Sequence, residues 1–515
     1  MLTSSSRPTN PRLALVVMAV LFALLNADIT TVNVALVTVG KDLHADLEDL
    51  QWGLNSYMLA FAALIVAAGR LADVFGRRRC LLAGAILFAL ASLLCGIAPS
   101  LSVFVVGRVL QGAGGALMLP AGMAIISVVY SGEERAVAMG TLVGVAGVAQ
   151  SIGPLVGGFL TAAVSWRLIF LINLPLIALI MFIALRAIQE SRDEHVSHRI
   201  DIAGVVILAA ALTSFLLGLD AAQGSDSNPR TALVLVVLAL ALFVVFPILE
   251  RRTDSAIVDG KLLQLPPFLC SCVGSCLLGF VFFLFLFITA VYLQEELGYG
   301  ALMAGIALVP FSLVLAVTGV MSGRLTKRFR LASLLIASCF SMGLGLAILS
   351  FVPASYGYNG MVFPFLLVAA GAGPGFTLLN TAGLAAVPAP RSGQATGMIY
   401  MFRFGGGAIG VAAASALHGA LFQRHLIPRL SKASLSFAQQ KLLEQPGAAE
   451  RIGQIDSGWG ASQVENVHQA FHESFVAAFS TTLRLNVILP IAIAILAMMF
   501  LEKKVKPTPS RDVAG

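Results

Sequence analysis

Two stretches of similar sequence lie far apart in the chain. Residues 69–79 read Gly69-Arg-Leu-Ala-Asp-Val-Phe-Gly-Arg-Arg-Arg79, and residues 323–330 read Gly323-Arg-Leu-Thr-Lys-Arg-Phe-Arg330. Each stretch follows the second apolar run of a series of six, and we interpret the second stretch as a weakened copy of the first. Internal repeats of this kind are typical of membrane proteins built from two related helical bundles.

The composition indicates that the chain lies in a membrane. Of the 515 residues, 58% are hydrophobic and only 11% are charged, whereas soluble domains carry about 25% charged residues. A soluble fold of this size cannot bury so much apolar surface, so part of that surface must face lipid. The apolar runs occupy residues 13–37, 50–72, 80–98, 102–130, 136–162, 167–187, 202–220, 231–249, 267–294, 301–323, 331–352, 359–386, 395–421 and 475–501.

These runs predict an all-α integral membrane protein with fourteen transmembrane helices, because a helix satisfies its own backbone hydrogen bonds in lipid. The first six runs and the last six are similar in rhythm, and two extra helices lie between them. We therefore expect two six-helix bundles at residues 1–190 and 263–515, joined by a two-helix insertion at 191–262. A mixed polar loop at 422–474, expected outside the cytoplasm and expected to contain short helices, interrupts the second bundle.

The basic residues predict the orientation of the chain. Loops on the side of the termini carry 22 of the 33 Lys and Arg residues, whereas the short loops on the opposite side carry three. Because short basic loops stay on the cytoplasmic side, we expect a protein of the cell (inner or cytoplasmic) membrane with both termini in the cytoplasm. The first apolar run, 13–39, is too long for a cleavable signal. The net charge of +7 is spread over many loops, which argues against a nucleic-acid partner.

Asp28 is the one acid that the sequence places well inside a predicted span. A carboxylate at membrane depth is costly, and Arg108 in the fourth span is its natural partner, because intramembrane charges tend to pair. We expect Asp28 to carry the coupling proton as its distance from Arg108 changes. The alternatives are a structural hydrogen bond and a fixed salt bridge that only orders the bundle. Arg403 and Arg484 receive no role, although we expect Arg403 to reach toward the cytoplasmic end of its span.

The loop at residues 69–79 is the most specific local pattern. Gly69 and Gly76 allow helices and a tight loop to approach closely. Asp73 can accept hydrogen bonds from a neighbouring helix N-terminus, and Arg77 and Arg78 can reach acids or helix C-terminal carbonyls. Together these residues are expected to hold the cytoplasmic side closed in one conformational state. The alternative is that the arginines only anchor the loop in the cytoplasm.

The fifth span combines small residues with a proline, at Gly153, Pro154, Gly157 and Gly158. Small residues on a helix face allow close packing, and Pro154 removes a backbone donor and favours a kink. We expect this helix to act as a hinge between the bundles, and static packing is the alternative.

Sparse polar and aromatic side chains in the spans predict a pocket for lipophilic or amphipathic cargo. The candidate residues, each of which can equally serve helix packing, are Asn26, Asn55, Tyr57, Gln111, Phe283 and Asn380. The six cysteines are interpreted as buried small hydrophobes. His468 and His472 have a spacing of four residues but lack further ligands. We expect no metal and no other cofactor, with the proton gradient as the driving force.

These motifs resemble those of a known family. Asp28-Ile-Thr-Thr-Val-Asn-Val-Ala-Leu36 is similar to the first-helix motif of the fourteen-helix drug:proton antiporter branch of the major facilitator superfamily. Residues 69–79 resemble the loop signature of the superfamily, Arg108-Val-Leu-Gln-Gly112 matches its fourth-helix motif, and residues 153–158 match its antiporter signature. The resemblance covers nearly the whole chain. It implies that Asp28 and Arg108 serve coupling and that the loop serves gating, although the copy at 323–330 lacks an acid.

The residues and the resemblance together predict a proton-coupled exporter of small lipophilic or amphipathic compounds, acting by alternating access. It is expected to be of a multidrug type, or else dedicated to one metabolite such as a siderophore or lipid. A proton-coupled importer and a membrane sensor are further alternatives. An enzyme is not expected, because the chain has neither a Walker-type loop nor a catalytic cluster in its loops. The expected partners are a small-molecule substrate, protons and the lipid bilayer, and the protein is expected to be a monomer.

Overall fold

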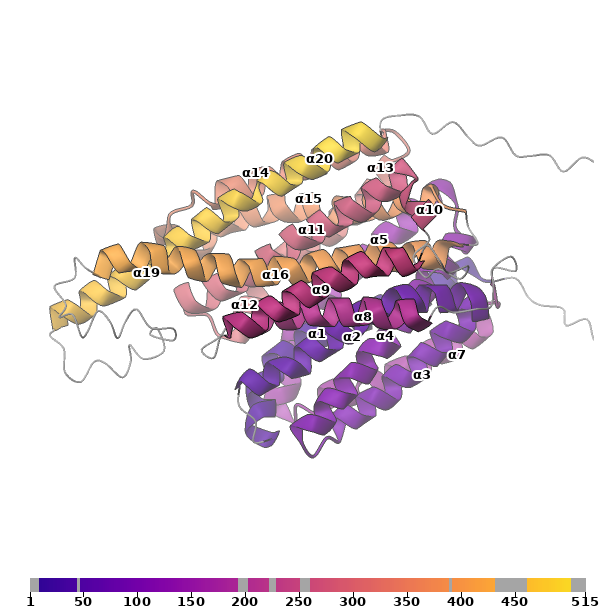
Figure 1. Ribbon diagram of the computed structural model, residues 1–515, viewed down its shortest axis with the longest axis horizontal. Helices are drawn as coiled ribbons and strands as arrows, with labels where there is room; N and C mark the ends of the chain where they lie inside the picture. Colours follow the sequence, from indigo (N-terminus) through magenta and orange to yellow (C-terminus); the bar gives the residue numbers. More distant parts are fainter. Residues whose placement is uncertain are drawn as a thin grey trace, which may run out of the picture.

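The protein is all-helical in the part of the chain that the structure describes. The computed structural model describes residues 9–43, 47–192, 202–221, 228–250, 260–388, 391–430 and 461–501, and a few side chains in these helices, including those of Asn55 and Pro154, lie outside the description. The helices of the first half and the central pair are α1 Pro11–Leu43, α2 Leu47–Phe75, α3 Arg77–Gly96, α4 Leu101–Val129, α5 Gly132–Ala163, α6 Leu168–Leu171, α7 Asn173–Ala187, α8 Ile202–Ala221 and α9 Pro229–Glu250. Those of the second half are α10 Gly260–Leu263, α11 Pro266–Val291, the π-helix η1 Tyr292–Glu296, α12 Ala301–Ala307, α13 Val309–Leu325, α14 Leu331–Leu349, the 3₁₀-helix η2 Ala354–Tyr356, α15 Gly357–Ala385, α16 Ser392–Leu430, α19 Ala461–Asn486 and α20 Ile488–Leu501 (Figure 1).

Twelve helical segments in the described ranges are long and apolar enough to cross a membrane. The two further spans of the expected fourteen correspond to α8 and α16. The apolar window of α8 is short, Ala203–Phe215, and α16 carries several glycines together with Gln394 and Arg403, which lower its hydropathy. The prediction of an all-helical, multi-pass membrane protein is confirmed.

Three predicted spans are broken into two helices, and each break precedes a proline. The breaks lie at Ile172, Leu308 and Val487, ahead of Pro175, Pro310 and Pro490. Because a proline ring clashes with the carbonyl four residues earlier and offers no N–H, regular α-helix is interrupted just before it. Each broken span remains one apolar segment that is long enough to cross a membrane.

Several joins between helices gather at one end of the molecule, which we call the latch end. Four hydrogen bonds tie these joins together: Asn10 N to Ala187 O at 2.9 Å, Arg77 N to Ser191 O at 3.0 Å, Tyr130 Oη to Pro11 O at 2.9 Å, and Arg135 Nη1 to Leu384 O at 3.4 Å. This is the end that we expect to face the cytoplasm. One apolar core fills the first half and also includes Phe268, Leu384 and Met398 of the second half. A second core fills the other half.

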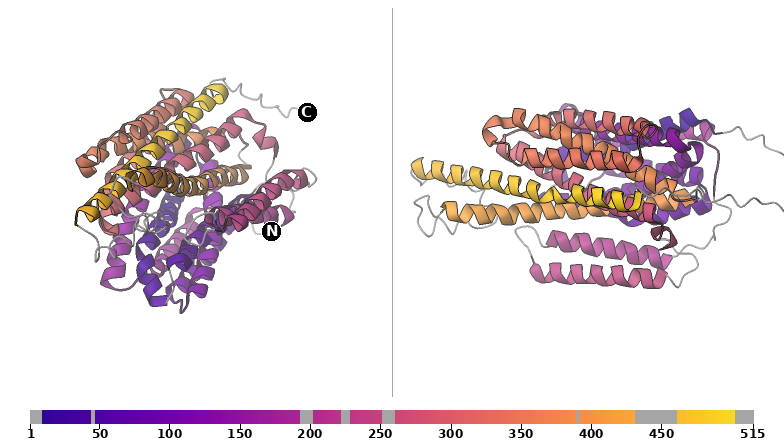
Figure 2. Two further views of the ribbon diagram at one scale, coloured as in Figure 1. Left: turned by 60° about the vertical axis from the view of Figure 1, so that its left-hand side comes forward. Right: turned by 90° about the horizontal axis from the view of Figure 1, so that it is seen from above.

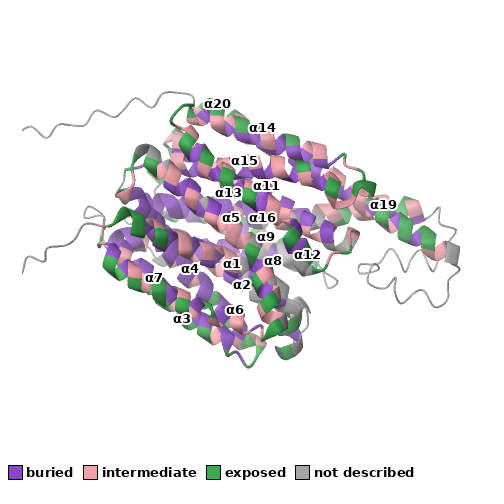
Figure 3. Ribbon diagram, turned by 180° about the vertical axis from the view of Figure 1, so that it is seen from behind, coloured by how far each residue is buried: buried purple, intermediate pink, exposed green. Residues whose placement is uncertain are grey.

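The surface of the helices is apolar where a soluble protein would be polar. Large side chains such as Leu90, Phe159 and Phe340 are more than half exposed, and exposed positions recur along the outer helices α3, α7 and α20 (Figure 3). The central pair α8 and α9 lies at the edge of the molecule (Figure 2), and α8 contacts α2 and α16. Apolar residues that face outward are expected in a protein whose solvent is lipid.

The segment at 422–474, expected as a mixed polar loop with short helices, is helical at both of its ends, where the helices of the flanking spans continue. Helix α16 continues to Leu430 and α19 begins at Ala461, whereas residues 431–460 lie outside the described ranges. The two helices extend together beyond the rest of the molecule (Figure 1). A small apolar cluster holds them side by side, formed by Leu426, Leu430, Val467 and Ala470. Apolar residues spaced three or four apart on both helices explain why the helical pattern persists outside the spans.

Close helix packing in the second half leads to a test of the fold with a matched pair of substitutions. A Cβ added at Gly345 in α14 would lie 2.7 Å from the backbone N of Val368 in α15, whereas a Cβ at Gly343 would come no closer than 3.7 Å to Pro490. Gly345→Ala is expected to lower stability by about 1–3 kcal/mol, as overpacking does. Gly343→Ala should leave the melting temperature of the purified protein unchanged or slightly higher, since alanine favours helix. Equal melting temperatures for the two variants would contradict this packing.

Candidate functional site

A buried ion pair joins α1 to α4 in the middle of the first half. Arg108 Nη1 lies 2.6 Å from Asp28 Oδ2, and both side chains are almost fully buried. A carboxylate and a guanidinium at this distance form a charge-assisted hydrogen bond. Each charge would be very costly in the interior without the other. The pair therefore constrains the relative position of the two helices.

Polar side chains from three further helices surround this ion pair. Gln111 accepts a hydrogen bond from Arg108 Nη1 at 2.8 Å and donates one to Ser92 Oγ in α3 at 2.7 Å. Asn173 in α7 donates to Asp28 Oδ1 at 3.2 Å. The guanidinium of Arg108 also lies 4.4 Å from the ring centre of Tyr57 in α2, within cation–π distance. Five helices thus meet at one polar cluster inside an apolar bundle.

Helix α5 connects the helix of Asp28 to the second half. A Cβ at Gly153 would overlap Thr30 Oγ1, and one at Gly157 would lie 2.7 Å from the Thr31 carbonyl, so α5 packs directly on the turn that follows Asp28. Thr31 also donates a hydrogen bond to the Gly153 carbonyl at 3.1 Å. Nearer the latch end, a Cβ at Gly140 would lie 2.5 Å from the Gly319 carbonyl of α13. The same helix therefore packs against both halves.

The loop at 69–79 holds the two halves together at the latch end. The carboxylate of Asp73 accepts hydrogen bonds from the backbone N–H groups of Gly393 at 3.3 Å and Gln394 at 2.8 Å, the first turn of α16. Arg77 lies 3.1 Å from the same carboxylate, and both side chains are buried. A Cβ at Gly69 would lie 2.5 Å from the Gly393 carbonyl. An acid at a helix N-terminus is stabilised by the helix dipole, and we name this contact the Asp73 latch.

A second carboxylate, Glu190, caps α3 within the first half. Its oxygens accept hydrogen bonds from the backbone N–H groups of Arg78 at 3.0 Å and Arg79 at 3.1 Å. Gly76 precedes this helix with φ of 111°, a conformation that favours glycine. A Cβ at Gly76 would also lie 2.5 Å from the Glu190 carboxylate. Arg78 Nη2 donates to the Leu185 carbonyl near the end of α7 at 3.1 Å. The sequence offered no clear signal for Glu190, because it lies more than a hundred residues from the helix it caps.

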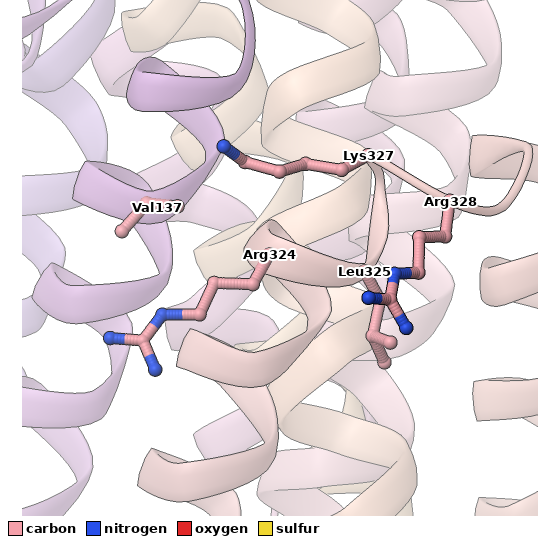
Figure 4. Close-up of a pocket in the computed structure, with 5 residues that line it drawn as sticks. All are labelled: Val137, Arg324, Leu325, Lys327 and Arg328. Atoms are coloured by element: carbon pink, nitrogen blue, oxygen red, sulfur yellow. The ribbon is translucent and has the colours of Figure 1, made fainter.

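The copy of the loop in the second half forms a basic hollow instead of a latch. The hollow has a volume of about 450 Å³ and is lined by Val137, Arg324, Leu325, Lys327 and Arg328. Figure 4 shows the side chains of Arg324 and Lys327 extending toward the helix that carries Val137. Among its lining residues there is no acid that could cap α5 as Asp73 caps α16. Among the described residues, the first-half loop thus joins the halves through a carboxylate, whereas the lining of this hollow offers none.

The predicted cavity residues have different neighbours in the structure. Tyr57 and Gln111 belong to the Asp28 cluster. Asn26 donates a hydrogen bond to the Phe22 carbonyl of its own helix at 2.8 Å, Asn380 is buried with its Nδ2 unpaired, and the ring of Phe283 lies 6.0 Å from that of Phe404. Gly158 is half-buried in α5. The side chains of Asn55 and Pro154 lie outside the description.

Arg403 was expected to reach toward the cytoplasmic end of its span, and its guanidinium contacts Tyr400, one turn nearer the start of α16. Its side chain lies inside the second half with 7% of its surface exposed. The guanidinium lies 4.5 Å from the ring centres of both Phe376 and Tyr400. The contact of Arg403 with Tyr400 could have been read from the sequence, because residues three apart on a helix share a face. The contact with Phe376 on α15 could not, because it depends on tertiary packing.

Glu296 lies at the end opposite the latch and forms an ion pair with His472 of α19. Its position follows the span that ends at Val291. Burial raises the pKa of Glu296, while His472 acts in the opposite direction. The six cysteines are free, five of them buried and Cys276 half-buried. No group of three or more His, Cys, Asp or Glu side chains in the described ranges is arranged to hold a metal ion.

Comparison with known proteins identifies relatives over most of the chain. Residues 16–411 match the sequence profile of a family described as the Major Facilitator Superfamily. The "Multidrug resistance protein Stp" of Mycobacterium tuberculosis (strain ATCC 25618 / H37Rv) is 31% identical over 423 residues, 81% of this chain and 78% of that protein. The "Tetracenomycin C resistance and export protein" of Streptomyces glaucescens is 28% identical, covering 92% of this chain and 89% of its own. The solved structure of the proton:xylose symporter XylE bound to 6-bromo-6-deoxy-D-glucose has a TM-score of 0.60 at 13% identity and covers 95% of this chain and 96% of its own, a likeness of fold alone.

The Asp73 latch can be tested by measuring the distance between the halves. Asp73→Asn removes the charge at the start of α16 and leaves Arg77 without its carboxylate partner. A carboxylate at a helix N-terminus stabilises the contact by up to about 2 kcal/mol. Its loss should therefore raise the population with separated latch ends about tenfold. Spin labels at the exposed positions Phe75 and Arg330, one on each half, report this separation by pulsed electron resonance.

Glu190→Gln is the matched control for this experiment, because Glu190 caps α3 without contacting the second half in the hydrogen bonds described above. It should lower the melting temperature while leaving the label distances as in wild type. A distance distribution that is unchanged in Asp73→Asn, or shifted equally in Glu190→Gln, would show that Asp73 does not hold the halves together.

Glu296 leads to an expected dependence of stability on pH. Because burial raises its pKa above the unfolded value of 4.5, the folded state favours the protonated form. Its contribution is therefore fully present at low pH and is lost as the pH rises through the folded pKa. Glu296→Gln should raise the melting temperature at pH 8 by about 2–4 °C and have little effect at pH 4. The exposed Glu473, which pairs with Arg429, is the control, since Glu473→Gln should give no such rise at pH 8.

Proposed function

This chain belongs to the Major Facilitator Superfamily, and we propose that it is a proton-coupled antiporter that exports small lipophilic or amphipathic compounds. The family is one of membrane transporters, so the chain is a transporter of small molecules rather than an enzyme. Export of drugs is supported by relatives named for drug resistance and antibiotic export. Proton coupling and the direction of transport are the proposed steps.

The observation that carries the proposal is the buried Asp28–Arg108 ion pair. When Asp28 binds a proton, its attraction for Arg108 is lost, and the guanidinium retains Gln111 and the ring of Tyr57 as its neighbours. Buried ion pairs have a high cost of separation, so proton binding changes the energy of the arrangement of α1 and α4. Asn173 donates to the carboxylate oxygen that Arg108 does not contact, and it can hold Asp28 in place in either protonation state.

Helix α5 supplies the mechanical link from Asp28 to the rest of the protein. A shift of α1 displaces α5 at Gly153 and Gly157, because these glycines pack directly on Thr30 and Thr31 of α1. The same helix contacts α13 through Gly140, so the shift is passed to the second half. Proton binding and substrate release can thus bias one movement, which is the requirement for coupling.

The Asp73 latch suits the closed state of the end that faces the cytoplasm. Basic residues gather at this end, so by the positive-inside rule we expect it to lie in the cytoplasm together with both termini. We infer that residues 1–190 and 263–515 move as two bundles, with 191–262 as an insertion at the edge, and that one chain is the functional unit. Opening the latch exposes the substrate path to the cytoplasm, and proton binding from the opposite side favours the return.

The proton gradient is sufficient for such export. A potential of 100 mV is worth about 2.3 kcal/mol per charge and one pH unit about 1.4 kcal/mol, so one proton can sustain roughly a several-hundred-fold gradient of a neutral compound. A second candidate function is export of one dedicated metabolite, which is favoured by relatives named for a single antibiotic such as tetracenomycin C. It uses the same proton mechanism and differs only in the width of the substrate range.

Proton movement in proteoliposomes tests this proposal directly. Purified protein is reconstituted with a pH-sensitive dye in the lumen, and a panel of lipophilic cations, anions and neutral compounds is added outside. Wild type is expected to move protons with at least one compound, and Asp28→Asn should reduce this movement at least about tenfold, because the one protonatable group at the ion pair is removed.

Asp42→Asn is the matched control, since Asp42 also pairs with an arginine, Arg167, but at the exposed end of α1. This variant should keep substrate-dependent proton movement. If Asp28→Asn remains coupled, Asp28 is not the proton carrier. If no compound moves protons in wild type, proton-coupled export of lipophilic compounds is wrong.

A further inference from the structure

Arg403 is the one buried arginine in the described ranges that lacks a buried carboxylate. The buried charged residues there are the arginines Arg77, Arg108 and Arg403 and the acids Asp28 and Asp73. Each acid already pairs with an arginine, Asp28 with Arg108 and Asp73 with Arg77. The guanidinium of Arg403 therefore has no matching anion within the described part of the protein.

Part of the hydrogen-bonding capacity of Arg403 is also unused. Its Nε and Nη2 are buried and have no hydrogen-bond partner among the described residues. Arginine inside a membrane protein is costly and marks a functional site by default. The two rings at 4.5 Å, Phe376 and Tyr400, stabilise the cation through their faces. The planar fork of N–H donors is thus left for an anion with oxygen atoms.

A continuous series of aromatic rings connects Arg403 to the Asp28–Arg108 cluster. Between ring centres, Tyr57 to Phe61 is 6.1 Å, Phe61 to Phe404 is 5.2 Å and Phe404 to Tyr400 is 6.1 Å. The step from Phe61 to Phe404 crosses from α2 in the first half to α16 in the second. Arg108 lies over the first ring of this series and Arg403 over the last. A flat apolar ligand placed along it would meet rings on both halves, with a cation at the end in the second half.

We propose that Arg403, Tyr400 and Phe376 form a binding subsite for the carboxylate, or a similar planar oxyanion, of an aromatic amphipathic substrate. The guanidinium donates Nε–H and Nη2–H to the oxyanion, and the two rings exclude water and pack against the adjoining apolar part of the ligand. The aromatic series toward Phe61 receives the rest of the ligand. This assignment rests on the proposed export function and names its substrate class as anionic aromatic compounds.

Three probes with the same ring system and different charge test the assignment. They are naphthalene-2-carboxylate, naphthalene-2-carboxamide and 2-naphthylmethylammonium, titrated by calorimetry into the full protein in lipid nanodiscs, with empty nanodiscs subtracted. Because hydrogen bonds between charged partners are strong, the carboxylate should bind about tenfold or more tighter than the carboxamide. The ammonium compound should bind more weakly still.

Variants at two arginines decide which residue makes this distinction. Arg403→Gln should abolish the preference for carboxylate over carboxamide, and Arg403→Lys, which keeps the charge but loses the planar fork, should retain part of it. Arg484→Gln is the matched control, because Arg484 also lies over a ring, Phe351, but donates to the Ser350 carbonyl. Its preference should equal that of wild type.

The outcomes separate this inference from the proposed function. Equal binding of carboxylate and carboxamide by wild type would overturn it, whichever variants fold, and so would a preference that persists in Arg403→Gln. Binding at equilibrium requires no proton transport, so Asp28→Asn should keep the carboxylate preference even where proton movement is lost. Loss of the preference only in Arg403→Gln supports the subsite, and the proteoliposome measurement decides coupling independently.

Discussion

The pairing of Asp28 with Arg108 is the constraint on which the arrangement of the first half depends. A charge in a helical bundle surrounded by lipid has no water to stabilise it, so the two residues fix α1 against α4 at hydrogen-bond distance. Gln111, Ser92 and Asn173 then satisfy the remaining donors and acceptors, which draws α3 and α7 into the same cluster. A proton bound to Asp28 would neutralise its carboxylate and so remove one of the two charges of the ion pair. Because five helices meet at this cluster, that change would affect all five.

The two halves share a fold but differ in their buried charged residues. The first half contains both buried acids of the described chain, one in the core and one in the Asp73 latch. The second half contributes a helix N-terminus to that latch and a buried arginine that pairs with no carboxylate of the described residues. Its copy of the 69–79 loop has cations around a hollow where the first half has Asp73. Our two proposals therefore assign proton chemistry to the first half and anion recognition to the second.

The sequence alone predicted those features whose physical cause lies in neighbouring residues of the chain. Apolar length predicts the spans, the scarcity of intramembrane charge singles out Asp28 and Arg108, and the acid at position 73 predicts a helix N-terminus as its partner. Distant partners were not predictable from one sequence. Glu190 is more than a hundred residues from the helix it caps, and Phe376 meets Arg403 only through the packing of α15 on α16. Gln111 was expected to line a cavity. In the structure its Oε1 accepts a hydrogen bond from Arg108, one turn away on the same helix.

The length of α16 has a mechanical consequence. Its 39 residues correspond to about 58 Å at 1.5 Å per residue, almost twice the roughly 30 Å of a hydrocarbon core. One end of this rod is fastened by Asp73, and the other forms the projecting hairpin with α19. A tilt of about 10° at the fastened end would swing the far tip by about 10 Å over such a length. Under our proposal, the projecting ends of α16 and α19 would therefore move when the Asp73 latch opens, and a molecule bound to these ends would oppose that opening.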